Sequence, residues 1–173
     1  MLVGSKNQLA IEYEIVGPPP SLSTRLCMWA NGHIVGDFSN PHLQLLGVVE
    51  YWLEVELKNA KRKYHPELVA QPKEEAFGVL HNAIYGGDNE TWETVEALSI
   101  KYGGCDLKEG LCSFDGWFVF LVSGNSEQRL LWRRDGAGVM EAKFPADTFE
   151  TIASECLRAI VADHVLHGRK HPS

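Results

Sequence analysis

Apolar and polar residues alternate along several short stretches of the chain, and this alternation predicts β-strands. Residues 9–16 show it most clearly, because every second residue is apolar and Glu12 and Glu14 lie between them. Such a pattern is typical of a half-buried strand with an acidic outer face. Residues 24–30 and 33–38 follow as a second and a third strand.

Asn31-Gly32 joins the second and third of these strands and predicts a tight hairpin. A type I′ turn needs a positive φ at both central residues, which Asn and Gly supply with little strain. A two-residue turn pairs Ala30 with His33 and Trp29 with Ile34. We therefore expect four side chains on one face of the hairpin: Cys27, Trp29, Ile34 and Phe38.

The most apolar run of the chain is Trp117–Val122, which contains no polar residue. Its short length and its aromatic and β-branched side chains predict a buried strand. Residues 129–134 and 139–144 follow as strands, each with one apolar and one largely charged face, so that Arg129 and Leu131 face outward. The second apolar face of Trp117–Val122 is therefore either covered by a helix or forms an apolar centre within a charged rim. We favour the helix, because most apolar surface of a monomer is buried.

Apolar residues three and four positions apart predict three or four helices, and Asp147 with Glu150 gives the last of them a start resembling a capping box. The order of elements indicates an α+β fold. We expect one domain over residues 1–173, with a mainly antiparallel sheet of about six strands, three or four helices largely on one face, and a flexible tail at 166–173. The predicted helices cover residues 42–64, 72–86, 90–102 and 147–168.

Composition places the chain among ordinary soluble proteins, with 45% hydrophobic and 23% charged residues. We find no signal peptide and no apolar run near the roughly 20 residues that cross a bilayer, so we expect a cytoplasmic protein. The net charge of −7 argues against nucleic acid or an anionic membrane as partner and is compatible with a basic protein partner.

Residues that often carry chemistry do not form a recognisable motif. His164 and His167, with His171 beyond them, lack a cysteine or carboxylate at ligand spacing. Asp163 and His164 resemble a dyad, but adjacent helical residues point in different directions. We therefore expect no catalytic residue, no metal and no cofactor. The alternative is a small enzyme or ligand-binding domain whose site is assembled from distant residues.

Cys105 and Cys112 flank a short loop and could lie close together. Cytosolic thiols generally stay reduced, so a disulfide between them is disfavoured, although their pairing stays open at this point.

Acidic residues cluster without a basic neighbour in one segment, where four acids occur within nine residues. One interpretation is a solvated helix face with acids near its positive N-terminal end. The other is a surface that binds a basic protein partner. The candidate partner-binding residues are Asp88, Glu90, Glu93 and Glu96, of which the last three share one side of the predicted helix.

Four short motifs lie along the strands and turns of the chain: Leu9-Ala10-Ile11-Glu12, Trp29-Ala30-Asn31-Gly32 with Gly36-Asp37, Phe114-Asp115-Gly116-Trp117 and Arg129-Leu130-Leu131-Trp132. In these motifs and their order the chain resembles a family of bacterial immunity proteins, the immunity protein 42 family, over nearly its whole length. This resemblance implies a non-enzymatic inhibitor that is made in the cytoplasm beside a cognate toxin domain, binds it and blocks its active site. No contact residue is transferred from the family to the acidic segment.

Overall fold

The computed structural model describes residues 1–17, 22–39, 43–87, 91–108 and 110–169, with side chains up to residue 166. The chain forms two compact units, each with its own antiparallel sheet. Unit 1 consists of Met1–Lys58, Gly110–Asp115 and Phe149–Ser173, and unit 2 of Asn59–Glu109 and Gly116–Thr148.

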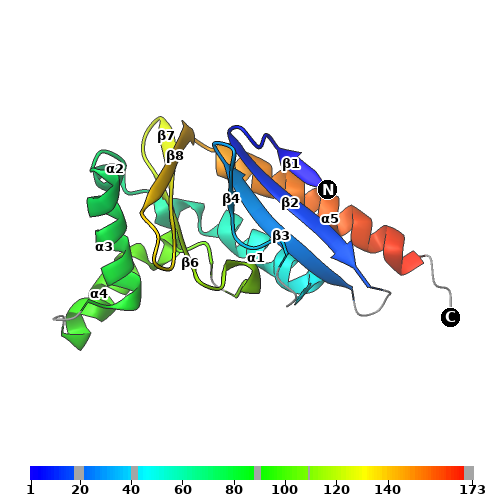
Figure 1. Ribbon diagram of the computed structural model, residues 1–173, viewed down its shortest axis with the longest axis horizontal. Helices are drawn as coiled ribbons and strands as arrows, with labels where there is room; N and C mark the ends of the chain where they lie inside the picture. The colour runs from blue at the N-terminus through cyan, green and yellow to red at the C-terminus, as the bar shows by residue number, and fades with distance from the viewer. Residues whose placement is uncertain (18–21, 40–42, 88–90, 109, 170–173) are drawn as a thin grey trace. The chain divides into compact units, whose positions relative to one another are not determined.

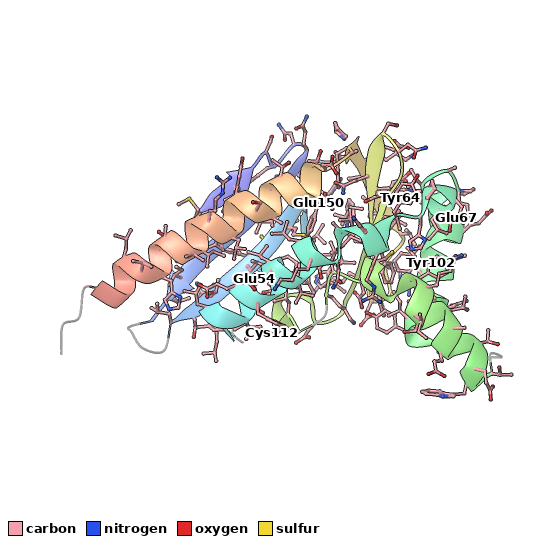
Figure 2. The ribbon with its side chains drawn as sticks, turned by 180° about the vertical axis from the view of Figure 1, so that it is seen from behind. Glu54, Tyr64, Glu67, Tyr102, Cys112 and Glu150 are labelled. Carbon is pink, nitrogen blue, oxygen red and sulfur yellow. The ribbon has the colours of Figure 1, made fainter. Side chains whose placement is uncertain are left out.

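Unit 1 contains a five-stranded sheet in the order β1-β2-β3-β4, with β5 also paired to β3. Helices α1 and α5 lie behind this sheet in Figure 1 and in front of it in Figure 2, so both cover the same face. The elements are β1 (Leu2–Gly4), β2 (Leu9–Val16), β3 (Ser23–Ala30), β4 (His33–Val35), β5 (Gln44–Leu45), α1 (Leu46–Lys58), the 3₁₀ turn Cys112–Phe114 and α5 (Thr148–Arg169).

The predicted hairpin is confirmed. Asn31 has φ 49° and Gly32 φ 79°, and the pairs Ala30–His33 and Trp29–Ile34 are the expected ones. Strand β4 is shorter than the predicted residues 33–38. It ends at Val35 because Gly36 turns the chain with φ 97°, after which the Asp37 N–H donates to the Ser113 carbonyl.

The helix-covered face of the unit 1 sheet holds a largely apolar core. Ile11 is paired with Met28 and Tyr13 with Leu26, and all four are buried. The helices contribute the apolar positions that their periodicity predicts, which on α5 are Phe149, Ile152, Ala153, Cys156 and Ile160.

Two predicted helices have different ends in the structure. Helix α1 begins at Leu46 rather than at residue 42, because Gln44 and Leu45 pair with β3 as strand β5. It ends at Lys58, and a 3₁₀ turn over Ala60–Lys63 follows. Helix α5 continues through the predicted end at Gly168 to Arg169, while residues 170–173 of the predicted tail lie outside the described residues.

Unit 2 contains a three-stranded sheet in the order β6-β7-β8. The α+β class is confirmed, but the described strands are divided between two sheets, where one sheet of about six strands is predicted. The elements are the 3₁₀ turns Ala60–Lys63 and Gly103–Cys105, α2 (Pro66–Val69), α3 (Lys73–Tyr85), α4 (Trp92–Tyr102), β6 (Trp117–Ser123), β7 (Glu127–Arg134) and β8 (Met140–Pro145).

Helices α2 and α3 cover the second apolar face of β6, which confirms the favoured alternative. Phe120 and Val122 of β6 pack with Leu131 of β7 against a buried cluster that includes Phe77 and Leu80 of α3. The prediction that Arg129 and Leu131 face outward to water is wrong, because the helices cover that side and both residues are buried.

Arg129 is accommodated in this interior by a full set of oxygen partners. Its Nη1 donates to the carbonyl oxygens of Leu68, Val69 and Gln71 at 3.0, 3.3 and 2.6 Å. Its Nε donates to Glu141 at 2.7 Å. A buried guanidinium is stable only when its donors are satisfied in this way. Arg129 therefore ties the end of α2 and the segment that follows it to the sheet.

Candidate functional site

The predicted acidic residues that the structure describes lie on the outer side of α4. Thr91 is the N-cap of this helix, since its side chain accepts a hydrogen bond from the Thr94 N–H. Glu93 and Glu96 follow three residues apart and are both exposed. Asp88 and Glu90 lie outside the described residues.

Two large apolar side chains accompany these acids. Trp92 is 77% exposed and Ile100 is 70% exposed, each four residues from Glu96. Side chains at this spacing share one helix face. We call Trp92, Glu93, Glu96 and Ile100 the α4 ridge.

Sequence reasoning missed Trp92 and Ile100, although apolar residues eight positions apart on an otherwise polar face were a usable signal. Exposed tryptophan is uncommon on a surface that only meets water, and aromatic residues are enriched in protein interfaces.

The opposite side of α4 packs against its own unit. Tyr102 is buried, and Leu98 packs against the apolar cluster of unit 2. Lys101 lies 3.7 Å from the Glu67 carboxylate of α2 and also lies over the Tyr102 ring. Figure 2 labels Tyr64, Glu67 and Tyr102 in this part of unit 2. Lys101, the basic residue nearest to the α4 ridge in sequence, is therefore already paired with Glu67.

The pKa of Glu67 is lowered, as expected for a carboxylate paired with Lys101. Burial acts to raise it, but the backbone N–H, His65 and Lys101 together bring the pKa below its ordinary value. Within the described residues, no ion pair involves Glu93 or Glu96. The α4 ridge thus combines uncompensated negative charge with exposed apolar surface.

The open face of the unit 1 sheet has a different electrostatic character. Lys6 and Trp29 both donate to Glu12 at 2.7 Å, and the Lys6 ammonium lies 3.9 Å from the Trp29 ring centre. The hydrogen bond from Lys6 lowers the pKa of Glu12, although burial partly opposes it. Arg25 pairs with Glu14 at 3.1 Å. Each acid here has its own base, so this face offers less unpaired charge than the α4 ridge.

Hollows on unit 1 are lined almost entirely by apolar side chains. One of about 410 Å³ lies between β5, α1 and α5, with Tyr51 and His164 on its lining. Another of about 550 Å³ lies along the outer side of α5, where Val161 and Val165 contribute. Neither brings together a pair of acid–base groups, so neither supports the alternative of an enzyme.

Asp163 and His164 do not act as a pair. Asp163 accepts a hydrogen bond from the Tyr13 hydroxyl at 2.9 Å, and His164 lies 2.9 Å from Glu50 of α1. These contacts hold α5 against β2 and α1. The side chains of His167 and His171, which complete the histidine group named above, lie outside the described residues.

The four cysteines are thiols, so Cys105 and Cys112 do not form a disulfide with one another. The described residues contain no group of three side chains that would hold a metal ion. None of the described helices has the length and apolar character required to cross a bilayer.

Comparison with known proteins identifies the family. A sequence model described as immunity protein 42 matches residues 1–159, which include most of both units. The chain belongs to the immunity protein 42 family. No curated protein sequence matches the chain.

A solved structure shares the fold of this family member. The crystal structure of CdiI from Burkholderia dolosa AUO158 superposes with a TM-score of 0.63 at 19% sequence identity. The alignment covers 92% of this chain and 99% of that one. At this identity the likeness concerns the fold alone.

Proposed function

We propose that this protein neutralises a cognate bacterial toxin domain by binding it and occluding its active site, without catalysing a reaction. The observation that carries the proposal is the match of the immunity protein 42 family to residues 1–159. Because this match includes residues of both units, we propose that residues 1–173 act together as one immunity domain in the cytoplasm.

The α4 ridge is the surface that we propose binds the toxin. Trp92 and Ile100 provide apolar area that association would remove from water, and buried aromatic anchors dominate many interfaces. Glu93 and Glu96, with Asp88 and Glu90 in the preceding segment, provide negative charge. The partner surface that fits this combination is a basic one with an apolar recess.

Charge complementarity makes a specific kinetic prediction. Charges at the rim of an interface act mainly on the association rate, and salt screens them. We expect Glu93→Lys/Glu96→Lys to slow association with the toxin domain by about tenfold or more at low salt and much less at high salt. Stability should change by no more than about 0.5 kcal/mol, because both side chains are exposed.

The association rate is measured by surface plasmon resonance at two ionic strengths. The binding partner is the toxin domain encoded beside the gene of this protein. Glu74→Lys/Glu75→Lys is the matched control, since it reverses two exposed acids in the first turn of α3. Equal slowing by both variants would show that only net charge matters and would reject the α4 ridge.

Occlusion is tested separately from binding. The bound protein should prevent the toxin domain from binding its substrate, so the two should compete in a substrate-binding assay. A ternary complex of toxin, substrate and this protein would reject occlusion while leaving neutralisation by another route in place.

A further inference from the structure

Three side chains of α3 lie across one aromatic ring of β6. Phe77, His81 and Tyr85 are spaced by four residues and therefore form one side of the helix. Their ring centres lie 6.4, 4.7 and 5.1 Å from that of Phe118. The rings of His81, Tyr85 and Phe118 form a partly exposed aromatic surface on unit 2, and Phe77 is a buried ring that packs with it.

A cation lies at each end of this surface. The Arg133 guanidinium of β7 lies 4.7 Å from the Phe77 ring and 5.2 Å from the Phe118 ring. The Lys108 ammonium lies 4.7 Å from the Tyr85 ring and 4.8 Å from the same Phe118 ring. We call these two cations, together with the adjacent His81 imidazole, the α3 cation cluster.

The neighbouring groups do not neutralise this cluster. Asp106 accepts hydrogen bonds from the Tyr85 hydroxyl and from the Lys108 backbone N–H, rather than from the Lys108 ammonium. Within the described residues, no carboxylate forms an ion pair with Arg133 or Lys108. Like charges that remain unpaired in a chain of net charge −7 are informative, because acids are abundant and the cations repel one another.

Both cations affect the pKa of His81. Burial lowers its pKa, and the charges of Arg133 and Lys108 lower it further, while a hydrogen bond with Asn82 acts in the opposite direction. The imidazole is therefore mainly neutral at pH 7 in the free protein. An anion placed between Arg133 and Lys108 would favour the imidazolium and raise this pKa.

Packing alone explains only part of the arrangement. Each cation gains a modest energy by lying over an aromatic ring. However, a guanidinium has five N–H donors in a planar fork that fits a carboxylate or a phosphate, and the cation–ring contacts use none of them in a hydrogen bond. The exposed acids of the same unit, Glu93 and Glu96, disfavour a polyphosphate chain and leave the single charge of a carboxylate as the better match.

We propose that Arg133, His81 and Lys108 form a docking site for a carboxylate, presented as an Asp or Glu side chain on the surface of the toxin domain. This inference rests on the proposed function for its partner, although the chemistry of the site does not depend on it. The protein would then bind its toxin through two electrostatically opposite surfaces of unit 2, an acidic one on α4 and a basic one on α3.

A small probe tests the chemistry without the toxin. The probe is the blocked tripeptide acetyl-Gly-Glu-Gly-amide, which carries a single carboxylate, and acetyl-Gly-Gln-Gly-amide is its uncharged control. The readout is the pH titration of the His81 ring by NMR. We expect the glutamate peptide at saturation to raise the His81 pKa by about half a unit or more, and the glutamine peptide to leave it unchanged.

Variants of the cluster show whether the peptide binds where we propose. Arg133→Gln and Lys108→Gln should each weaken the glutamate peptide's effect on His81, whereas Lys73→Gln removes a charge from the first turn of α3 and should not. No His81 response to the glutamate peptide, or an equal loss in all three variants, would overturn the site. A response to inorganic phosphate or to a short oligonucleotide but not to the glutamate peptide would also overturn it.

A second experiment measures binding to the toxin domain itself. We expect Arg133→Gln/Lys108→Gln to weaken toxin binding by at least about tenfold, the effect of losing charge-assisted hydrogen bonds. If the wild-type protein binds the toxin and this variant binds equally well, the docking site is wrong and the proposed function stands. If the wild-type protein does not bind the toxin, the proposed function fails, and the peptide titration still decides whether the site binds carboxylates.

Discussion

The two sheets differ in whether the face that carries their charged residues is exposed to water or covered by helices. In unit 1 the face of β2 and β3 that α1 and α5 do not cover carries ion pairs in contact with water, such as Arg25 with Glu14. In unit 2 the corresponding charged face of β7 lies under α2 and α3, and Arg129 is only 2% exposed. The same residue type, on one strand of each sheet, thus meets two different environments.

This difference shows what a buried charge requires. Arg25 and Glu14 keep 40% and 51% of their side-chain surface exposed, so water solvates both, and such pairs contribute little to stability. Arg129 has exchanged that water for Glu141 and three backbone carbonyl oxygens. Its contribution depends on all of these partners being present together.

The largest expected effect comes from removing the buried arginine. Arg129→Met should destabilise unit 2 by about 3–5 kcal/mol, because it leaves three carbonyl oxygens without a donor and Glu141 without its partner. Arg25→Met, the matched change in unit 1, should alter stability by less than about 1 kcal/mol. Urea unfolding followed by amide hydrogen exchange separates the amides of β7 from those of β3 and measures each effect in its own unit.

Similar losses for the two arginine variants would contradict the comparison. So would an Arg129→Met protein whose β7 amides keep wild-type protection, because that result would mean that the carbonyl contacts contribute nothing to unit 2.

Sequence patterns predicted the strands well because strand signals are local. The alternation in residues 9–16, the Asn31-Gly32 turn and the apolar run Trp117–Val122 each occupy their predicted elements. The outward assignment of Arg129 was wrong for a non-local reason, since a strand pattern does not show which helix will cover its charged face. Strands β1 and β5 were missed because runs of three and two residues carry too little periodicity.

The candidate site was predictable only in part. The acids were visible as a cluster, but two of the four lie outside the described residues, and the eight-residue spacing of Trp92 and Ile100 on a polar helix face was a signal that was not used. The α3 cation cluster was out of reach, because Lys108, His81 and Arg133 come from three separate segments that only the fold brings to one ring.

A second contrast between the units concerns their glycine turns. Gly36 and Gly136 both have positive φ values, 97° and 76°. A Cβ on Gly36 would lie 2.8 Å from the Phe114 ring, whereas a Cβ on Gly136 would meet nothing within 4 Å. We expect Gly36→Ala to destabilise unit 1 by about 2–4 kcal/mol, from backbone strain together with overpacking. Gly136→Ala should cost about 1 kcal/mol from strain alone.

The same hydrogen-exchange measurement distinguishes these variants, now with the amides of β3 as the readout for Gly36→Ala. Equal effects would show that the contact with Phe114 relaxes freely and that only the backbone conformation matters at both turns. A Gly136→Ala effect larger than that of Gly36→Ala would reverse the comparison.

The smallest expected effect concerns two buried cysteines of unit 1. It tests whether water is excluded from the residues beneath the polar side chains of the open sheet face as well as it is from the core under the helices. Cys27 lies on the open face next to Glu12 and Trp29, and Cys156 lies on α5 in the covered core. Burial raises the pKa of both thiols from 9.0 to about 12, with Glu12 adding to the effect at Cys27.

A thiol whose pKa is raised by folding stabilises the protein fully below its unfolded pKa, and this contribution is lost as pH rises toward the folded value. We therefore expect each thiol to remove about 1 kcal/mol of stability between pH 8 and pH 10. Under reducing conditions, Cys27→Ala and Cys156→Ala should each make the stability of unit 1 fall less steeply over this range. Cys112→Ala, which removes a half-buried thiol of the same unit, should change the slope less. A slope altered by Cys156→Ala but not by Cys27→Ala would show that water reaches Cys27, and that the layer of Lys6, Glu12 and Trp29 does not seal the open face.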